Sequence, residues 1–511
     1  MSLQLHVDGR QVEVPDDGAS LLEVLRDRLG LKSAKDGCSP QGQCGCCTVL
    51  VDGQPRVACV TPARRVEGRA ITTLDGLPAE VRDAWAQAFT AAGASQCGFC
   101  TPGIIVRLAA LNGSPAAGPL EADEVEQALL AHLCRCTGWR TIVDAAAGAP
   151  PAPGRDLDAA SRRATLEGGV PQRVGPDVAL GEGGFADDTA PRDALVAVMD
   201  GGGEWVVAET LTEARRLAGT VQGRRTTLPP SYPLEAPDGE WDLTLRTAWI
   251  EPAYLEPDAS WCMPGGVSVS PLANGGAFGG KARSIAPEVA RRLADEHGRP
   301  VRVLLTREDT VRLGPKRPPV AAGIRADGTG VIRVVRTPGV VDAIAAVAPQ
   351  LVVHEVDVAG PSTSVASRGA GWAEAAVLVA AATRADTIVA PNGARARASI
   401  AADGSLEVEV RCGRALDEVV LRSYCVGAAH MALGWVRSEG LYVDDDGEVH
   451  DLTIRSFGIL RARDMPDVRV TIDDDGSEPV NGSDAVFAAV ALAAWKADGL
   501  APEWPTRRGS S

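Results

Sequence analysis

Short runs in which hydrophobic and polar residues alternate open the chain. Alternation covers residues 3–7 and 11–14, on either side of Asp8-Gly9. Because Asp-Gly is a favoured two-residue hairpin turn, this segment is predicted to form a β-hairpin. Residues 48–57 repeat the pattern around another Asp-Gly pair. A second hairpin is predicted there.

Helical periodicity appears between and after these hairpins. Residues 21–29 carry apolar side chains at helical spacing, which predicts one helix. The pattern turns helical again from about 78 to 145. There Pro102 fits the first turn of a helix, where no N–H is needed, and residues 125–133 carry an apolar residue at every fourth position. We therefore expect an α+β domain over 1–77 and a helical domain over 78–148.

A Pro-rich stretch separates this part from the remainder. Residues 149–165 open with a run of alanines and prolines, and a semi-extended linker is predicted over the whole range. Strand-like runs dominate beyond it. We expect a small α/β domain over 166–265 and a larger α+β domain over 266–511. Within the larger one, residues 284–297 have the pattern of a helix.

Composition limits the kind of protein. The chain is 45% hydrophobic and 23% charged, as soluble globular proteins are. Its formal net charge of −16 argues against nucleic acid as the main partner. No apolar run approaches the length of a membrane span, and the N-terminus lacks the pattern of a signal peptide. We expect a cytoplasmic protein, in which clustered cysteines are metal ligands or catalytic thiols rather than disulfides.

The first cysteine set lies in a glycine-rich loop. Cys38, Cys44, Cys46 and Cys47 fall within ten residues, and Cys59 follows. The plant-type [2Fe–2S] pattern is C-x4-C-x2-C with a fourth cysteine further on, and here the first spacing is one residue longer. We predict Cys38, Cys44, Cys47 and Cys59 as ligands, with Cys46 as a surplus thiol. A set in which Cys46 replaces Cys44 or Cys47 remains open.

The second set is C-x2-C, then 33 residues, then C-x-C. Its members, Cys97, Cys100, Cys134 and Cys136, are predicted to bind a second metal centre. Spacing alone leaves open a structural zinc site with four cysteine ligands.

Taken together, the two sets resemble the iron–sulfur part of the molybdenum hydroxylases, the xanthine dehydrogenase and aldehyde oxidase family. Residues 37–49, 96–103 and 133–138 carry the resemblance. It implies a plant-ferredoxin-like β-grasp domain with one [2Fe–2S] cluster and a four-helix domain with another. It also places Gln96 near a molybdopterin.

The second half resembles the molybdenum-binding part of that family. Residues 174–188 look like the start of its α/β "hammerhead" domain, and residues 275–281 look like its glycine-rich cofactor loop. Residues 367–375 resemble the segment with a substrate-facing arginine, and residues 428–435 and 480–487 look like later cofactor-lining segments. Without the resemblance, residues 275–281 would equally suit a glycine-rich bulge between strands.

This resemblance implies specific site residues. Arg368 would orient the substrate or stabilise its charge, and Asp484 is the candidate base. The implied cofactor-binding residues are Gln96, Gly275, Gly276, Ala277, Phe278, Gly279, Gly280, Arg368, Gly482 and Ser483.

The chain departs from the family pattern at the catalytic base. The family has a glutamate after a glycine, whereas here Gly482 is followed by Ser483 and then Asp484. Serine is not a base at neutral pH without activation. Lys281 is followed by Ala282 where a second glutamate is common. The molybdenum-binding part is also short, and no flavin domain is recognised.

The expected function is a molybdenum-dependent hydroxylase acting on an aldehyde or N-heterocycle. The implied cofactors are two [2Fe–2S] clusters and molybdenum–molybdopterin, with the cytosine dinucleotide as one form. A flavoprotein subunit or other acceptor would take the electrons, and a homodimer is one assembly option. Rival interpretations are a non-catalytic electron carrier with a docking module, and a cofactor chaperone or storage protein.

Overall fold

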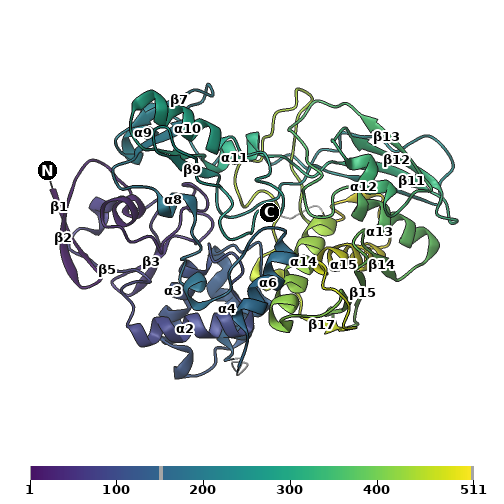
Figure 1. The fold of residues 1–511 in the computed structure, drawn as a ribbon, viewed down its shortest axis with the longest axis horizontal. Helices are drawn as coiled ribbons and strands as arrows, with labels where there is room; N and C mark the ends of the chain where they lie inside the picture. Colours follow the sequence, from purple (N-terminus) through teal and green to yellow (C-terminus); the bar gives the residue numbers. More distant parts are fainter. Residues whose placement is uncertain (1, 149–153, 508–511) are drawn as a thin grey trace.

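The computed structural model describes residues 2–148 and 154–507, within which the strands form four sheets (Figure 1). The first sheet has the order β2-β1-β5-β3-β4 and contains both predicted hairpins. Ser20 caps the short helix α1, which continues as the π-helix η1 over the predicted segment. The bounds are β1 (Ser2–Val7), β2 (Arg10–Pro15), α1 (Leu21–Glu23), η1 (Val24–Arg28), β3 (Thr48–Val51), β4 (Gln54–Val57) and β5 (Ala70–Thr72).

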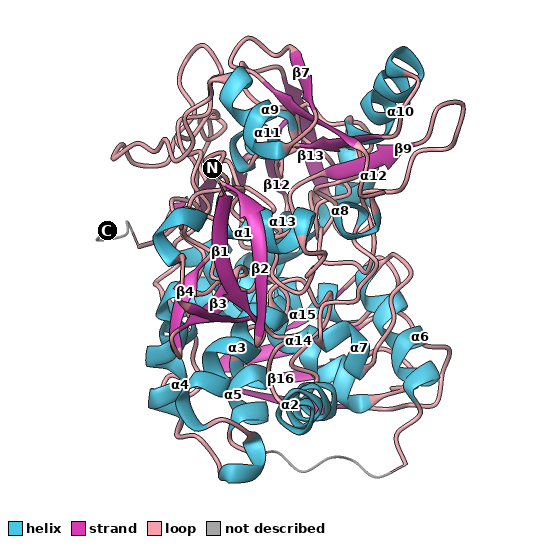
Figure 2. Cartoon of the chain, turned by 90° about the vertical axis from the view of Figure 1, so that its left-hand side faces the viewer, coloured by secondary structure: helices cyan, strands magenta, loops and turns pink. Residues whose placement is uncertain are grey.

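Helices follow the first sheet in sequence and lie below it in Figure 2. They are α2 (Ala79–Ala92), α3 (Thr101–Asn112), α4 (Ala122–Ala128) and α5 (Arg140–Ala146). Pro102 lies in the first turn of α3, as predicted. The helix predicted to run to residue 133 was too long. After α4 the chain tightens into the 3-10 turn η4 (Leu129–Ala131), and Leu133 to Cys136 form a loop.

The predicted linker differs from the structure in its second part. Residues 149–153 lie outside the described residues, but α6 (Leu157–Gly168) begins soon after them. Asp156 caps this helix through the N–H groups of residues 158 and 159. Ala160 and Ala164 of α6 pack against the long helix α14 (Glu418–Arg437). This segment therefore belongs to the packed second half of the chain.

The boundary expected at residue 265 does not coincide with a break between sheets. The second sheet, β7-β6-β10-β9, takes strands from both sides of that position, and so does the third, β13-β12-β11-β8-β18. Helices α9 and α10 cover opposite faces of the second sheet. The bounds are α7 (Pro176–Ala179), α8 (Ala186–Thr189), β6 (Leu195–Met199), β7 (Trp205–Ala208), α9 (Leu211–Ala218), β8 (Leu243–Thr247), β9 (Ala259–Cys262), α10 (Ala286–His297) and β10 (Val301–Leu304).

Two sheets and five α-helices form most of the described C-terminal half. The third sheet is completed by β11 (Val320–Ile324), β12 (Gly330–Val335), β13 (Leu351–Val356) and β18 (Glu503–Trp504). The fourth sheet contains β14 (Thr387–Val389), β15 (Arg395–Ile400), β16 (Leu406–Arg411) and β17 (Val468–Ile472). The helices of this half are α11 (Arg307–Leu313), α12 (Val340–Ala345), α13 (Trp372–Thr383), α14 and α15 (Ser483–Ala497).

Helix α14 is long and apolar enough to cross a bilayer by composition. However, 89% of its apolar window is buried inside the protein, against helices α6 and α15. It is therefore built as the core helix of the C-terminal half.

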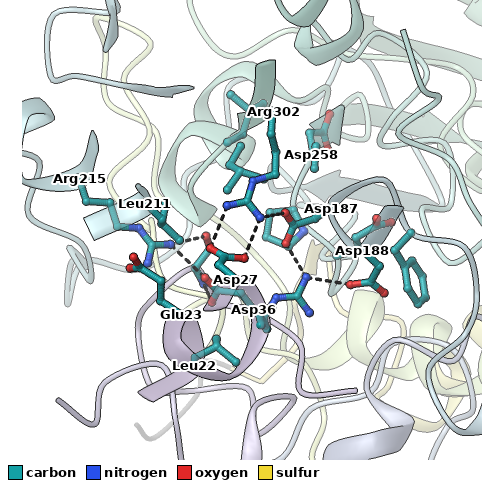
Figure 3. Close-up of a pocket in the computed structure, with 18 of the residues that line it drawn as sticks. Leu22, Glu23, Asp27, Asp36, Asp187, Asp188, Leu211, Arg215, Asp258 and Arg302 are labelled. Atoms are coloured by element: carbon teal, nitrogen blue, oxygen red, sulfur yellow. Dashed lines mark hydrogen bonds and ion pairs between the residues drawn. The ribbon is translucent and has the colours of Figure 1, made fainter. Parts of the chain in front are cut away.

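Charged residues join the first sheet domain to the second sheet (Figure 3). Arg26 of η1 pairs with Asp187 (2.6 Å) and Asp188 (2.8 Å) of α8. Arg302 of β10 pairs with Asp27 (2.9 Å) and with Asp187 (3.0 Å). Both guanidinium groups are almost fully buried. Since each of these charges has a partner across the interface, we interpret this cluster of ion pairs as a structural contact between the two parts.

Replacing Asp187 with alanine is expected to destabilise this interface by about 3 kcal/mol, because two buried guanidinium groups each lose a partner. The measurement is the first unfolding transition in urea. The matched control is Asp357→Ala, which breaks the exposed Arg336 pair and should cost under about 1 kcal/mol. Equal effects of the two substitutions would contradict the prediction.

The stabilisation by Asp187 should also depend on pH. Burial acts to raise the pKa of this carboxyl, but Arg302 and Arg26 outweigh it and hold the pKa well below its usual value. The contribution is therefore complete above about pH 4 and is lost as the pH falls further. The wild type and the Asp187→Ala variant should converge in urea stability in acid.

Candidate functional site

The first cysteine set forms a buried loop beside the first sheet. The backbone N–H groups of Gln41 and Gln43 donate to the Cys38 sulfur at 3.2 and 3.4 Å, and the N–H of Cys59 donates to the Cys47 sulfur at 3.4 Å. Such N–H donors stabilise thiolates, the form that binds iron. The backbone of this loop is therefore oriented to stabilise thiolate ligands.

The second cysteine set is arranged as two pairs. The Cys97 and Cys136 sulfurs lie 3.6 Å apart, and the Cys134 thiol, followed by burial, raises the pKa of Cys100. Two pairs suit a two-iron cluster, in which each iron takes two protein ligands. Among the described residues, no three Cys, His, Asp or Glu side chains converge as a single ion would require.

One backbone hydrogen bond connects the two sets. The N–H of Leu133, next to Cys134, donates to the carbonyl oxygen of Cys44 at 2.9 Å. Gly103 lies against the same loop, where a Cβ would come within 2.4 Å of the Gly45 carbonyl oxygen. The glycine permits the helix after Cys100 to approach the first loop. The two sets are therefore immediate neighbours.

Arg135, between the last two cysteines, ties the second set to the C-terminal half. Its guanidinium forms a bidentate pair with Glu439 at 2.6 and 2.7 Å, and both side chains are 2% exposed. Its Nε donates to the Pro252 carbonyl oxygen. Because the loop is held by charge-assisted bonds on two sides, its orientation is fixed.

The predicted glycine loop lies against the second cysteine set. A Cβ at Gly276 would be 2.9 Å from Cβ of Cys97, so only glycine fits this contact. Asn274 anchors the loop by donating to the Gln96 carbonyl oxygen at 3.3 Å. Gln96 itself donates to the Cys136 carbonyl oxygen at 3.0 Å. The structure thus brings together Gln96, the loop and the cysteines.

The same loop leads to a second small cavity. Gly275 to Ala277 line the space beside the cysteines, and Phe278 lines a neighbouring cavity with Arg368 and Phe487. Arg135 borders both. Gly279 and Gly280 continue the loop beyond Phe278, and a Cβ at Gly279 would lie 1.9 Å from the Ala366 carbonyl oxygen.

Arg368 and Asp484, expected to act together, are in direct contact. Arg368 Nε lies 2.8 Å from Asp484 Oδ1, and its Nη2 donates to Ser483 Oγ at 2.6 Å. Arg368 is buried, whereas the Asp484 side chain is 31% exposed. The carboxylate beside Ser483 is Glu167 of α6, which accepts the backbone N–H groups of Gly482 and Ser483.

Sequence reasoning missed several polar residues at these cavities. Glu251 lines the Arg368 cavity and forms a buried ion pair with Lys316 at 2.9 Å. Ser367 Oγ and Trp435 Nε1, in the same lining, have no hydrogen-bond partner among residues 2–148 and 154–507. The sequence around Glu251 offers only the dipeptide Glu251-Pro252, which is too short to identify a site.

A further buried amide lies at the glycine loop. Gln172 accepts a hydrogen bond from Tyr424 at 2.5 Å, while its Nε2 has no partner within the described part of the chain. A Cβ at Gly275 would be 2.4 Å from that nitrogen. Beside the exposed backbone of the loop, this free donor suits a polar cofactor with acceptor atoms. The residues at this position therefore fit a pterin, while the base position does not follow the family pattern.

His430, in a segment expected to line the cofactor, instead packs inside the protein. It is fully buried on α14, and its Nε2 lies 3.0 Å from the Leu460 carbonyl oxygen. Its neighbour Met431 does reach the cavity, 3.5 Å from Arg368.

Comparison with known proteins identifies the two N-terminal domains. Residues 5–70 match the family described as "2Fe-2S iron-sulfur cluster binding domain", and residues 73–147 match "[2Fe-2S] binding domain". The second match favours iron–sulfur over zinc at the later cysteines.

Two curated relatives cover the same part. The xanthine dehydrogenase iron-sulfur-binding subunit of Escherichia coli O157:H7 is 43% identical over 145 residues, which are 28% of this chain and 85% of the relative. The nicotinate dehydrogenase small FeS subunit of Eubacterium barkeri is 38% identical over 146 residues, 28% of this chain and 88% of the relative.

The fold of the whole chain also has a solved counterpart. The aldehyde oxidoreductase from Desulfovibrio desulfuricans ATCC 27774 aligns with a TM-score of 0.69, covering 99% of each chain at 15% sequence identity. At that identity the likeness concerns the fold. It confirms the predicted multidomain α+β architecture.

The packed state of His430 has a measurable consequence. Burial first, and Arg135 second, lower the pKa of His430 to about 4 from 6.5. A lowered pKa means that stability is complete above pH 6.5 and is lost as the pH falls through 4. Relative to His430→Gln, the wild type should lose up to ~3 kcal/mol of urea stability over that range.

The control for this prediction is the exposed His6. His6→Gln should leave the acid profile of the wild type unchanged. If His430→Gln has the same slope as the wild type between pH 6.5 and 4, the imidazole is not held neutral by burial.

Proposed function

The chain belongs to the molybdenum hydroxylase family, and on that premise we propose that it is a molybdenum-dependent oxidoreductase that hydroxylates an aldehyde or an N-heterocycle. Electrons would leave through two [2Fe–2S] clusters. The observation that supports this best is the course of residues 275–278. One glycine loop contacts Cys97 of the second cysteine set and also lines the cavity that contains Arg368.

We assign the cluster ligands from the contacts of the thiols. The first cluster would be held by Cys38, Cys44, Cys47 and Cys59, and the second by Cys97, Cys100, Cys134 and Cys136. The Cys38 sulfur accepts the backbone N–H groups of Gln41 and Gln43, and the Cys47 sulfur accepts the N–H of Cys59. The Leu133–Cys44 hydrogen bond then gives electrons a short covalent and hydrogen-bonded route from the second cluster to the first.

The pterin would lie between the second cluster and the Arg368 cavity. Gln172 Nε2 and the backbone of Gly275 to Ala277 would hold it, with Gln96 behind the loop. When bound, the molybdenum cofactor supplies the two-electron oxidation and the hydroxylation chemistry. The cytosine dinucleotide form is one option, for which Gly482 and Ser483 are the remaining cofactor-binding candidates.

The side chains around Arg368 would position the substrate. Phe278 and Phe487 supply apolar ring faces, while Ser367 Oγ and Trp435 Nε1 offer polar contacts. Arg368 would orient the substrate by its charge. Asp484 is the carboxylate in contact with Arg368, and we propose it as the proton acceptor.

A second candidate function follows from Ser483. Where the family has a carboxylate, this serine is fully buried and its N–H is bound by Glu167. A non-catalytic electron carrier, with the C-terminal half as a docking module, would not need that carboxylate. In either case a flavoprotein subunit or another acceptor would receive the electrons. A homodimer remains an assembly option.

Metal analysis of the purified protein distinguishes the two functions. The hydroxylase should contain about four irons and about one molybdenum per chain, with extractable pterin, because each cluster holds two irons. EPR after reduction should show two distinct cluster signals. Four irons without molybdenum or pterin would support the electron carrier instead.

Once a substrate is found, Asp484→Asn tests the proposed base. Loss of general-base catalysis should lower kcat about 10²- to 10⁴-fold with little change in KM. The control is Asp386→Asn, an exposed aspartate paired with Lys496, which should turn over normally. Undiminished turnover by Asp484→Asn would exclude this residue as the base.

A further inference from the structure

The first cysteine set comes close to the protein surface at Val60. This residue directly follows Cys59, which is buried at 4% exposure, yet Val60 is 51% exposed. A Cβ at Gly42 would lie 3.0 Å from Cγ2 of Val60, so Val60 also packs on the loop between Cys38 and Cys44. An exposed apolar side chain therefore covers the buried thiols of the first set.

Basic residues flank Val60 in a chain that is acidic as a whole. Arg56, Arg64 and Arg65 are exposed and lie within five residues of Val60 in the sequence. Residues 53–66 include no aspartate or glutamate, although the formal net charge of the chain is −16. Within the described part of the chain, none of these three guanidinium groups forms an ion pair or a hydrogen bond. Their positive charge is therefore available to a partner.

A fourth arginine reaches the same loop from the C-terminal half. Arg455 is exposed, and its Nε donates to the carbonyl oxygen of Gln43 at 2.9 Å. Gln43 is the neighbour of Gly42, on which Val60 packs. The loop beneath Val60 thus receives positive charge from two distant parts of the chain.

We propose that this surface docks an electron-acceptor protein whose contact surface is acidic. The surface, which we call the Val60 patch, consists of Val60, Arg56, Arg64, Arg65 and Arg455. One electron would leave the reduced first cluster here and enter a one-electron acceptor, with no bond formed or broken. The inference rests on the first cluster of the proposed function and adds the kind of partner. It does not depend on molybdenum.

The physical reason is the contrast between local and overall charge. Protein interfaces commonly have an apolar centre and a polar rim in which arginine is enriched, as the Val60 patch does. A chain with a net charge of −16 repels an acidic protein at long range, so only local positive charge can attract one. Salt screens attraction and repulsion alike. The sign of the salt dependence therefore reports which of the two the acceptor meets.

The test is reduction of two haem proteins of opposite charge, acidic cytochrome b5 and basic cytochrome c. The full chain with its clusters in place is reduced with dithionite, freed of excess reductant and mixed with either acceptor, and haem absorbance records each electron received. Between about 0.01 and about 0.15 M ionic strength the Debye length falls from about 30 to about 8 Å. The rate for cytochrome b5 should fall over this range, and the rate for cytochrome c should rise.

Two variants locate the effect. Arg64→Gln combined with Arg65→Gln should reduce cytochrome b5 about tenfold more slowly at low salt, because electrostatic steering is weakened. Val60→Glu places a negative charge at the centre of the patch, so it should slow the reaction with cytochrome b5 and accelerate that with cytochrome c. An iron content of about four per chain shows that each variant keeps both clusters.

The matched control is Arg395→Gln combined with Arg397→Gln. It removes the same two charges from exposed positions of β15, which lies on the right of Figure 1, whereas the first sheet lies on the left. This control should keep the wild-type rates and salt dependence.

Three results would overturn the proposal: salt dependences of opposite sign to those expected, equal effects of the two double variants, or an unchanged cytochrome b5 rate in Arg64→Gln/Arg65→Gln. A wild-type protein with fewer than two cluster signals would instead refute the proposed function, so the two failures are distinguishable.

Discussion

The buried ion pair between Arg135 and Glu439 is the constraint on which the arrangement of the chain depends. Two charged side chains that are only 2% exposed are stable only when they are paired with each other. The pair therefore fixes where the second cysteine set meets the C-terminal half. The neighbouring contacts depend on the position of this loop, including the Leu133 hydrogen bond to the first cysteine set and the contact of Gly276 with the second set. The two cysteine sets and the glycine loop are therefore arranged around one guanidinium.

Much of the N-terminal architecture was predictable from the sequence, because its signals are local. Asp-Gly turns, alternating strands and Pro102 each act within a few residues, and the hairpins and α3 formed as predicted. The errors arose where distant packing decides the structure. Helix α6 was hidden by the Pro-rich stretch before it, and β8 joins a sheet whose other strands come much later in the chain. No local sequence pattern indicates which distant strands will pair in one sheet.

Only part of the candidate site was predictable from the sequence. The family resemblance identified Arg368, Ser483 and Asp484 as candidates, and in the structure Arg368 contacts both of the others. Glu167, Gln172 and Glu251 could not have been found in the same way, because each is a single polar residue in ordinary context. Their roles come from burial: a carboxylate or amide surrounded by protein must find a partner or present a free atom to a ligand. That property appears only once the chain is folded.

The interface in Figure 3 also has a consequence for assembly. Arg26 and Arg302 hold the iron–sulfur domains to the second sheet through ion pairs, a type of contact that gives little net affinity between separate proteins. Here both sides belong to one polypeptide, so the effective concentration of one for the other is of millimolar order. A polar interface is sufficient under that condition. It keeps the two cysteine sets and the C-terminal half in equal number and in contact at any dilution.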